Sequence, residues 1–387
     1  MIKKVSECIE NISEECIQLS EYILENPELG NEEVKACKAH VDLLKKYGFE
    51  VEEEYMGIKT AFRATFDSTK EGATIAYLAE YDALPGIGHG CGHNILGATS
   101  TGAGITLSKV IKEIGGKVVV FGTPAEETNG AKVHIVDNGG FDDIDISMMA
   151  HPAGKHYKSG SSLAMQAIQF IFRGRTAHAA ADPEKGINAL DAVINTFNNI
   201  NALREHIKSD ARVHGIIKEG GKAANIVPDL AIAQFYVRAT TKTYLKELIE
   251  KVKNCARGAS LAAGTELEIT NYEATYDNLV TNKHLSEIYT RRLKDMGVEK
   301  IYEPKESYGS LDAGNVSQVC PTIHPYFSIS DKELVGHTRE LAEATKTPLA
   351  YARMKQTIGA LVLTAIDLIK DNKLLNEIKT EFKNTEK

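Results

Sequence analysis

Two side chains in a glycine-rich segment of the sequence are of types that metal ions prefer as ligands. Cys91 and His93 stand two residues apart in the run Gly-His-Gly-Cys-Gly-His-Asn. The glycines let the backbone fold closely around an ion, and a thiolate beside an imidazole suits Zn²⁺ or another borderline divalent metal. Either residue alone could be an ordinary structural one. Together, and between glycines, they predict a metal site.

A pair of adjacent carboxylates forms a second candidate group. Glu126 and Glu127 follow a run of apolar residues and a Thr-Pro turn. Inward-pointing neighbouring carboxylates repel each other unless a cation or a shared proton relieves them. We therefore predict that one of them binds metal while the other, with a raised pKa, transfers protons. A solvent-exposed pair is the alternative explanation.

Two histidines are further candidates. His151, in Ala-His-Pro, ends an apolar run, where both a metal ligand and an ordinary strand-terminal histidine are reasonable interpretations. His337 stands beside a glycine in a polar loop that precedes a predicted helix.

The predicted elements explain how these residues could meet. Asp82, the pair that begins with Glu126, and His151 each come shortly after a predicted strand. In open α/β sheets, ligands bind beyond the carboxyl ends of the strands. We therefore expect the three polar clusters to lie at the same edge of one sheet.

The order of the elements predicts two domains. Strands alternate with helices over residues 1–162 and again over 273–387, which is typical of an α/β domain with a mostly parallel sheet. Residues 163–272 instead show the order β-α-β-β-α-β, which predicts an inserted ferredoxin-like α+β domain. Near the C-terminus we expect one strand over 322–329 and a long helix over 351–369, followed by a polar tail.

Composition excludes several classes of protein. The 387 residues carry a formal net charge of −8, whereas nucleic-acid binding needs a basic surface. There is no apolar run long enough to span a membrane and no secretory signal pattern at the N-terminus. The six cysteines lack the spacing of a disulfide framework. We expect a soluble cytoplasmic protein.

Taken together, the motifs resemble those of the M20 family of metallopeptidases and amidohydrolases over nearly the whole chain. The nearest branch is that of the aminoacylase-1-like-2 and aminobenzoyl-glutamate hydrolase B-type proteins. Six motifs carry the resemblance in order, at residues 80–94, 122–127, 150–152, 172–179, 225–229 and 336–340.

The resemblance implies a site for two divalent metal ions per subunit, Zn²⁺ or Mn²⁺. The implied ligands are Cys91, His93, Glu127, His151 and His337. Cys91 would lie between the metals, Glu126 would be the catalytic carboxylate, and Asp82 would orient a ligand from behind.

For the inserted domain, the resemblance implies a lid that also forms the contact of a homodimer. His178 matches a histidine that polarises the scissile carbonyl, often in the partner subunit. Asn225 and Arg238 match positions that hold a substrate carboxylate, and a guanidinium suits that task because it can donate two parallel hydrogen bonds.

These residues lead to one functional hypothesis. We expect hydrolysis of the amide bond of small N-acyl or aminoacyl amino acids with a free carboxylate, such as aminobenzoyl-glutamate-like compounds or dipeptides. A metal-activated water would attack, Glu126 would serve as general base, and His178 would stabilise the oxyanion.

The sequence departs from the family pattern at four positions, of which Gly90 in place of an alanine is a small change, and two rival functions stand beside the hypothesis. Asn94 and Ile95 replace the Asp and His of related hydrolases, which bears on the substrate class. Glu80 stands where peptidase branches carry a metal-binding histidine, which argues against a broad-specificity peptidase. One rival is a catalytically idle metal- or ligand-binding partner in a hetero-complex. The other is a phosphatase-like metallohydrolase, disfavoured because no Arg/Lys-rich phosphate cradle lies near the metal motifs.

Overall fold

The computed structural model describes residues 1–304 and 308–386, which form two compact units. The first unit comprises residues 1–161, 279–304 and 311–386, and the second comprises residues 162–278 and 308–310. Each unit has its own hydrophobic core. Among the helices in the described part of the chain, none is both long and apolar enough to cross a lipid bilayer.

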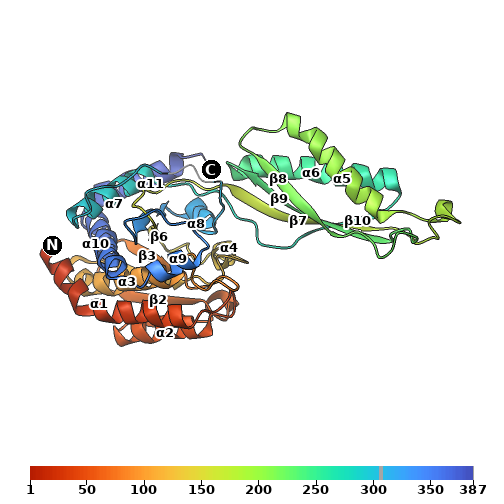
Figure 1. The fold of residues 1–387 in the computed structure, drawn as a ribbon. Coiled ribbons are helices and arrows are strands. Elements are labelled where there is room, and N and C mark those ends of the chain that lie inside the picture. Colours follow the sequence, from red (N-terminus) through yellow and green to blue (C-terminus); the bar gives the residue numbers. More distant parts are fainter. Residues whose placement is uncertain (305–307, 387) are drawn as a thin grey trace. The chain divides into compact units, whose positions relative to one another are not determined.

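The first unit is built on a six-stranded sheet with the strand order β1-β2-β4-β3-β5-β11 (Figure 1). Strands β4, β3, β5 and β11 pair in parallel, whereas β1 and β2 add an antiparallel edge. The strands are β1 (Glu50–Glu53), β2 (Phe62–Asp67), β3 (Thr74–Ala79), β4 (Lys117–Gly122), β5 (Ile146–Met148) and β11 (Thr322–Ile323). The predicted α/β class with a parallel-containing sheet is confirmed.

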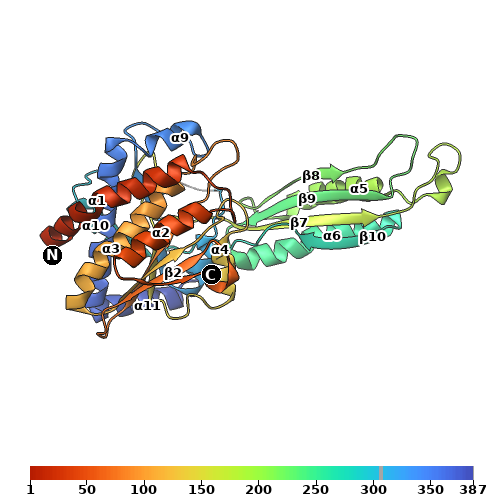
Figure 2. The same ribbon diagram turned by 90° about the horizontal axis from the view of Figure 1, so that it is seen from below.

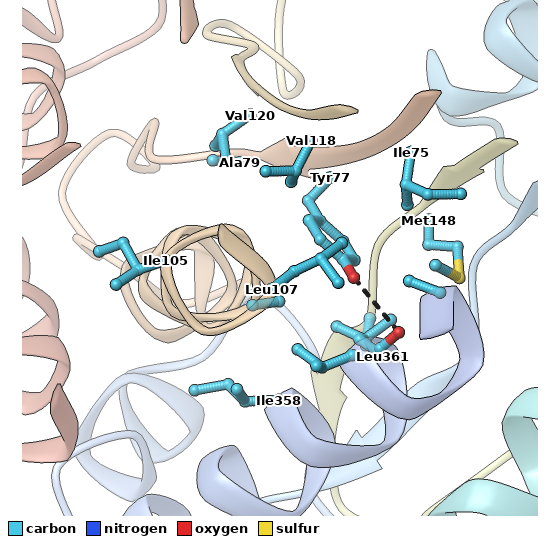
Figure 3. Close-up of a cluster of buried hydrophobic side chains, with 14 of the residues drawn as sticks. Ile75, Tyr77, Ala79, Ile105, Leu107, Val118, Val120, Met148, Ile358 and Leu361 are labelled. Atoms are coloured by element: carbon cyan, nitrogen blue, oxygen red, sulfur yellow. Dashed lines mark hydrogen bonds between the residues drawn. The ribbon is translucent and has the colours of Figure 1, made fainter. Parts of the chain in front are cut away.

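Helices cover both faces of this sheet. Helices α1 (Ile2–Glu25), α3 (His93–Ile114) and α10 (Pro348–Lys370) gather on one face. On that face, Tyr77 of β3 donates a hydrogen bond of 3.2 Å to the carbonyl oxygen of Leu361 (Figure 3). Leu78, the next residue of β3, packs on the other face with residues of α4 (Ala131–Asp137) and α8 (Ala313–Val319). Because successive strand residues point to opposite faces, one buried strand supplies both cores.

The helices and remaining elements of the first unit complete the layers. They are α1 (Ile2–Glu25), α2 (Val34–Lys46), η1 (Tyr55–Gly57), α3 (His93–Ile114), α4 (Ala131–Asp137), β6 (His151–Ala153), α7 (Lys283–Asp295), α8 (Ala313–Val319), β12 (Tyr326–Ser328), α9 (Arg339–Ala344), α10 (Pro348–Lys370) and α11 (Asn372–Asn384).

Two glycines let α3 pack closely in the middle of this unit. A Cβ atom on Gly102 would lie 2.7 Å from Cδ1 of Ile358 and 2.9 Å from Sγ of Cys16. A Cβ atom on Gly104 would lie 2.3 Å from Cγ2 of Val120. Separations this short are excluded by van der Waals repulsion, so glycine at both positions brings the helix close to its neighbours.

The second unit is a four-stranded antiparallel sheet with two helices on one face (Figure 2). Its strand order, β10-β7-β9-β8, is that of a ferredoxin-like fold and confirms the predicted class of the inserted domain. The elements are β7 (Ala164–Arg173), η2 (Pro183–Lys185), α5 (Ala189–Leu203), η3 (Arg204–His206), β8 (Arg212–Glu219), β9 (Leu230–Ala239), α6 (Lys242–Ala263) and β10 (Glu266–Asn271).

Two predictions near the C-terminus are wrong. The expected strand over 322–329 is divided into β11 and β12, because the chain leaves one sheet at His324 and pairs with β6 in another. The expected polar tail forms α11, whose N-terminus is capped by the Asp371 carboxylate and whose Leu375 and Ile378 side chains are buried. Two well-spaced apolar residues are enough to anchor this mostly polar helix.

Candidate metal centre and active site

The five predicted metal ligands all belong to the first unit and lie close together. The described residues contain three groups of possible ligands, and within each group the ligand atoms all lie within 4.8 Å of one another. The groups are Cys91–His93–His151, Cys91–Glu127–His337 and His93–Glu126–Glu127. Cys91, His93 and Glu127 each belong to two of these groups, so the three groups overlap in one cluster of possible ligands.

Asp82 fixes two of these residues at once. Nδ1 of His93 donates hydrogen bonds to the Asp82 Oδ1 atom, at 2.9 Å, and to the Asp82 carbonyl oxygen, at 3.1 Å. The other carboxylate oxygen accepts the backbone N–H of Glu127 at 2.9 Å. Burial opposes ionisation of Asp82, but the neighbouring His93 outweighs it and the net effect is a lowered pKa. The arrangement leaves Nε2 of His93 facing the other ligands.

His151 presents its second ring nitrogen in the same way. Its Nδ1 donates a hydrogen bond of 2.8 Å to the Pro152 carbonyl oxygen, and its Nε2 lies 3.5 Å from Sγ of Cys91. Burial, together with the nearby rings of His324 and His93, lowers the pKa of His151 to about 3. The ring is therefore neutral at physiological pH, and the Nε2 lone pair is available to a metal.

The backbone is strained on both sides of the centre. His337 has φ = 62°, and Ala125, directly before the acidic pair, has φ = 61°. The His337 N–H donates to the Gly90 carbonyl oxygen at 2.9 Å, and the Ala125 N–H donates to Oε1 of the buried Glu33 at 2.8 Å. Such left-handed conformations are costly for residues other than glycine and occur preferentially at functional sites.

Glu126 has the electrostatic setting of a proton carrier. Burial raises its pKa well above the usual range, and the nearby carboxylates Glu80 and Asp312 raise it further. Its neighbour Glu127 instead lies with Oε1 at 3.3 Å from Nε2 of His337. The two adjacent carboxyl groups thus have different surroundings, as a division between proton transfer and metal binding requires.

The donor atoms fit a divalent cation. Within the described residues, the buried atoms His93 Nε2 and Glu127 Oε1 have no hydrogen-bond partner, although both point toward other possible ligands. Unpartnered buried polar atoms are costly in free energy unless something else satisfies them. A thiol with imidazoles and carboxylates is a set that borderline metals such as Zn²⁺ bind.

Sequence reasoning missed a buried ionic cluster behind these ligands. Nζ of Lys132 lies 2.6 Å from Oε1 of Glu80 and 2.7 Å from Oδ1 of Asp312. All three side chains are buried, and the segments that carry them are far apart in the sequence. The signal that could have found Lys132 is its place beside Ala131 in the first turn of a short helix that begins four residues after Glu127.

A cavity of about 320 Å³ in the first unit adjoins the ligands. Its lining includes His324 and Tyr326, whose rings each lie with their centroids 5.5 Å from that of His151. Lys155 and Glu333, which also line the cavity, pair at 2.6 Å. Space for a substrate group is therefore present beside the candidate metal centre.

The other three predicted site residues belong to the second unit, where two of them are neighbours. The loop that carries His178 pairs with the loop that carries Asn225: the Ala179 N–H donates to the Asn225 carbonyl oxygen at 3.0 Å. Nδ1 of His178 accepts the backbone N–H groups of Ala180 and Ala181, at 3.2 and 3.1 Å. In the neutral ring the proton is therefore on Nε2, which makes His178 an exposed hydrogen-bond donor.

Arg238 lies at the opposite end of the same sheet. It pairs with Met165 at the start of β7, whereas Leu230, beside the loop of Asn225, pairs with Arg173 at the end of β7. At about 3.3 Å per residue, the eight steps of β9 between Leu230 and Arg238 span about 26 Å. The Arg238 guanidinium donates a hydrogen bond of 2.9 Å to Oγ of Ser310.

Comparisons with known proteins identify relatives over almost the full chain. The model of the "Peptidase dimerisation domain" of M20 proteins matches residues 164–262. The Xaa-Arg dipeptidase of Mus musculus is 36% identical over 98% of this chain and 92% of its own length. A p-aminobenzoyl-glutamate hydrolase chain of Escherichia coli, the B-type one, is 32% identical over 76% of this chain and 65% of its own length.

A solved structure has the same fold. A dinuclear metal-binding peptidase of the M20 family from Bacillus subtilis aligns with 93% of this chain and 100% of its own, with a TM-score of 0.67 and 19% sequence identity. The ligand groups in the first unit, the ferredoxin-like second unit and the extent of the sequence match agree with one another. The chain therefore belongs to the M20 family of metal-dependent peptidases and amidohydrolases, enzymes that hydrolyse C–N bonds.

Proposed function

We propose that this chain hydrolyses the amide bond of N-acyl or aminoacyl amino acids, dipeptides included, at a centre that holds two divalent cations. The observation that carries the proposal is the overlap of three groups of possible ligand atoms, in which Cys91, His93 and Glu127 are each common to two groups. The proposed ligands are Cys91, His93, Glu127, His151 and His337. Zn²⁺ and Mn²⁺ are the proposed metals, since the set combines a thiolate and imidazoles with a carboxylate.

The residues around the cations divide the chemistry between them. When bound, the cations supply Lewis-acid polarisation of the scissile carbonyl and favour deprotonation of water. Asp82 holds His93 and the Glu127 backbone in place. Glu126, whose pKa is raised, takes the proton of the attacking water and returns it to the leaving amine.

His178 is proposed to stabilise the oxyanion. Its Nδ1 is occupied by two backbone N–H groups, so the exposed Nε2–H is the atom that can donate to a substrate oxygen. Donors aimed at developing negative charge lower the free energy of the transition state. Asn225, on the paired loop, is positioned to bind substrate beside it.

The geometry of the second unit supports a homodimer in which subunits complete each other's sites. His178 and Asn225 lie at one end of its sheet and Arg238 at the other, about 26 Å apart by strand rise. A small substrate cannot bridge that distance. We therefore propose that Arg238 serves one active site while His178 and Asn225 serve the site of a partner subunit.

The substrate class follows from the proposed role of Arg238. Its guanidinium, beside the Ser310 hydroxyl, is suited to a free carboxylate. The names of the relatives agree, since a dipeptide with C-terminal arginine and aminobenzoyl-glutamate both carry one. We propose dipeptides with C-terminal arginine as the first substrates to test, because the mouse relative matches over more of the chain.

A direct experiment tests the proposal. Purified chain, reconstituted with Zn²⁺ or Mn²⁺, is assayed against a panel of dipeptides and N-acyl amino acids, and its metal content is measured. We expect about two metal ions per chain, the stoichiometry of the dinuclear relative, and turnover of at least one carboxylate-bearing substrate. Full metal content without turnover of any panel member would favour the alternative of a catalytically idle partner.

We also propose that the protein works in the cytoplasm. No disulfide joins any of the six cysteines in the described part of the chain. Thiols, such as that of the proposed metal ligand Cys91, persist in a reducing compartment, whereas disulfides are common in oxidising ones.

A further inference from the structure

The buried ionic cluster behind the metal centre has one more negative than positive group. Lys132 is fully buried between Glu80, at 2.6 Å, and Asp312, at 2.7 Å, and these two side chains are 2% and 0% exposed. One ammonium is thus shared by two carboxylates. A buried negative charge is unfavourable unless a positive group balances it, which a metal ion on the neighbouring ligands would do.

The unshared oxygen shows where that cation belongs. Glu80 uses Oε1 for Lys132, while its buried Oε2 accepts no hydrogen bond from the described residues. Oε2 lies 3.4 Å from Nε2 of His93. Since Asp82 occupies Nδ1 of that ring, Nε2 is the atom that would meet a metal.

Glu80 nevertheless lies outside the groups of possible ligand atoms. It is absent from the three groups whose atoms lie within 4.8 Å of one another among the described residues. It therefore lies beside the ligand set, on the side of His93, with its orientation fixed by a lysine that is itself held by Asp312.

We propose that Glu80 is a positioning residue of the metal centre: its unshared oxygen supplies the negative charge that balances the cation on His93, and Lys132 holds it there. This inference rests on the proposed metal centre. Removing a partner that supports a metal ligand typically weakens metal affinity by about 10- to 100-fold, and we expect an effect of that size.

The chain offers a matched control for this proposal. Glu80→Gln and Asp312→Asn each remove one negative charge from the same cluster, and each leaves Lys132 with one carboxylate and with an amide oxygen that can accept its other hydrogen bond. Only Glu80 faces His93. A comparison of the two variants therefore shows whether metal affinity depends on where the negative charge lies or only on the total charge of the cluster.

The experiment is a Co²⁺ titration of metal-free protein, followed through the absorption of the thiolate–Co²⁺ pair. We expect Glu80→Gln to raise the dissociation constant about 10- to 100-fold. Asp312→Asn should stay within about threefold of wild type, because Coulomb effects fall with distance. Glu80→Asp, which keeps the charge but shortens the side chain, should lie between wild type and Glu80→Gln.

Several results would overturn the inference. Unchanged affinity in Glu80→Gln, or an equal loss in Asp312→Asn, would show that the Glu80 oxygen has no special role. If Glu80→Gln does not fold, unchanged affinity in Glu80→Asp is decisive against it. A different result would refute the proposed metal centre itself: either the wild-type protein shows no cobalt band, or Cys91→Ala leaves the band in place. The two failures are therefore distinguishable.

Discussion

The two units of this chain present their proposed functional residues in opposite ways. In the first unit, His93 and Asp82 are buried and joined by hydrogen bonds, so the ligand geometry exists before any substrate arrives. In the second unit, His178 and Asn225 lie exposed on paired loops. The difference teaches that metal binding needs a rigid, desolvated pocket, whereas residues that contact substrate need to be reachable.

The largest expected effect is at Glu126, the proposed proton carrier of the first unit. Glu126→Gln removes the carboxylate proposed to accept the proton of water but keeps the size of the side chain. We expect kcat to fall about 10²- to 10⁴-fold, as for other general bases. Metal content should stay near wild type, because Glu127 remains as the proposed ligand. Activity above a few per cent would show that another residue carries the proton.

A mixture of two inactive variants tests whether the second unit serves a partner subunit. Dimers formed from Glu126→Gln and His178→Ala chains contain one complete site only if His178 acts across subunits. Random reassociation should then restore roughly a quarter of wild-type activity, since half of the dimers are mixed and each has one working site. No recovery, with mixed dimers demonstrated by mass spectrometry, would place His178 in its own subunit's site.

Substrate recognition by Arg238 should give a smaller effect. Arg238→Ala removes a charged hydrogen-bond donor, which is worth about 1.5–3 kcal/mol, so KM should rise about 10- to 100-fold. A substrate whose C-terminal carboxylate is amidated should be affected little. Lys242→Ala, which removes another basic residue of the second unit that pairs with Asp277, serves as control. Equal losses for both substrates would contradict carboxylate binding.

The smallest expected effect concerns Glu33, which supports the strained turn of the first unit. Burial raises its pKa to about 7 even though Ala125 and Thr60 donate to it. Because the folded-state pKa exceeds the unfolded value, its contribution to stability is full below about pH 4.5 and declines as pH rises through about 7. Denaturant unfolding of metal-free protein between pH 5 and 8 should show this slope, and Glu33→Gln should flatten it.

Much of this organisation could be predicted from the sequence, for reasons that differ between residues. Cys91 and His93 were recognisable because they stand between glycines, and the five proposed ligands all occur in three overlapping groups of possible ligand atoms. The ferredoxin-like unit was predictable because its strand and helix patterns follow one another in the order β-α-β-β-α-β. Local patterns of this kind survive in any context.

The features that escaped prediction depend on contacts between distant segments. Lys132 reads as a surface residue until Glu80 and Asp312 are brought to it by the fold. Glu33 likewise has no local signal, because its partner Ala125 is 92 positions away. The α11 helix was missed because its stability comes from packing of Leu375 and Ile378 rather than from its mostly polar composition.

The close packing of α3 links the position of His93 to the packing of the hydrophobic core. This helix begins at His93, and Gly102 and Gly104 lie about 15 Å further along its axis, at about 1.5 Å per residue. A larger side chain at either glycine would push α3 away from its neighbours, and His93 at the start of the helix would move with it. A substitution far from the site would in this way displace a proposed metal ligand.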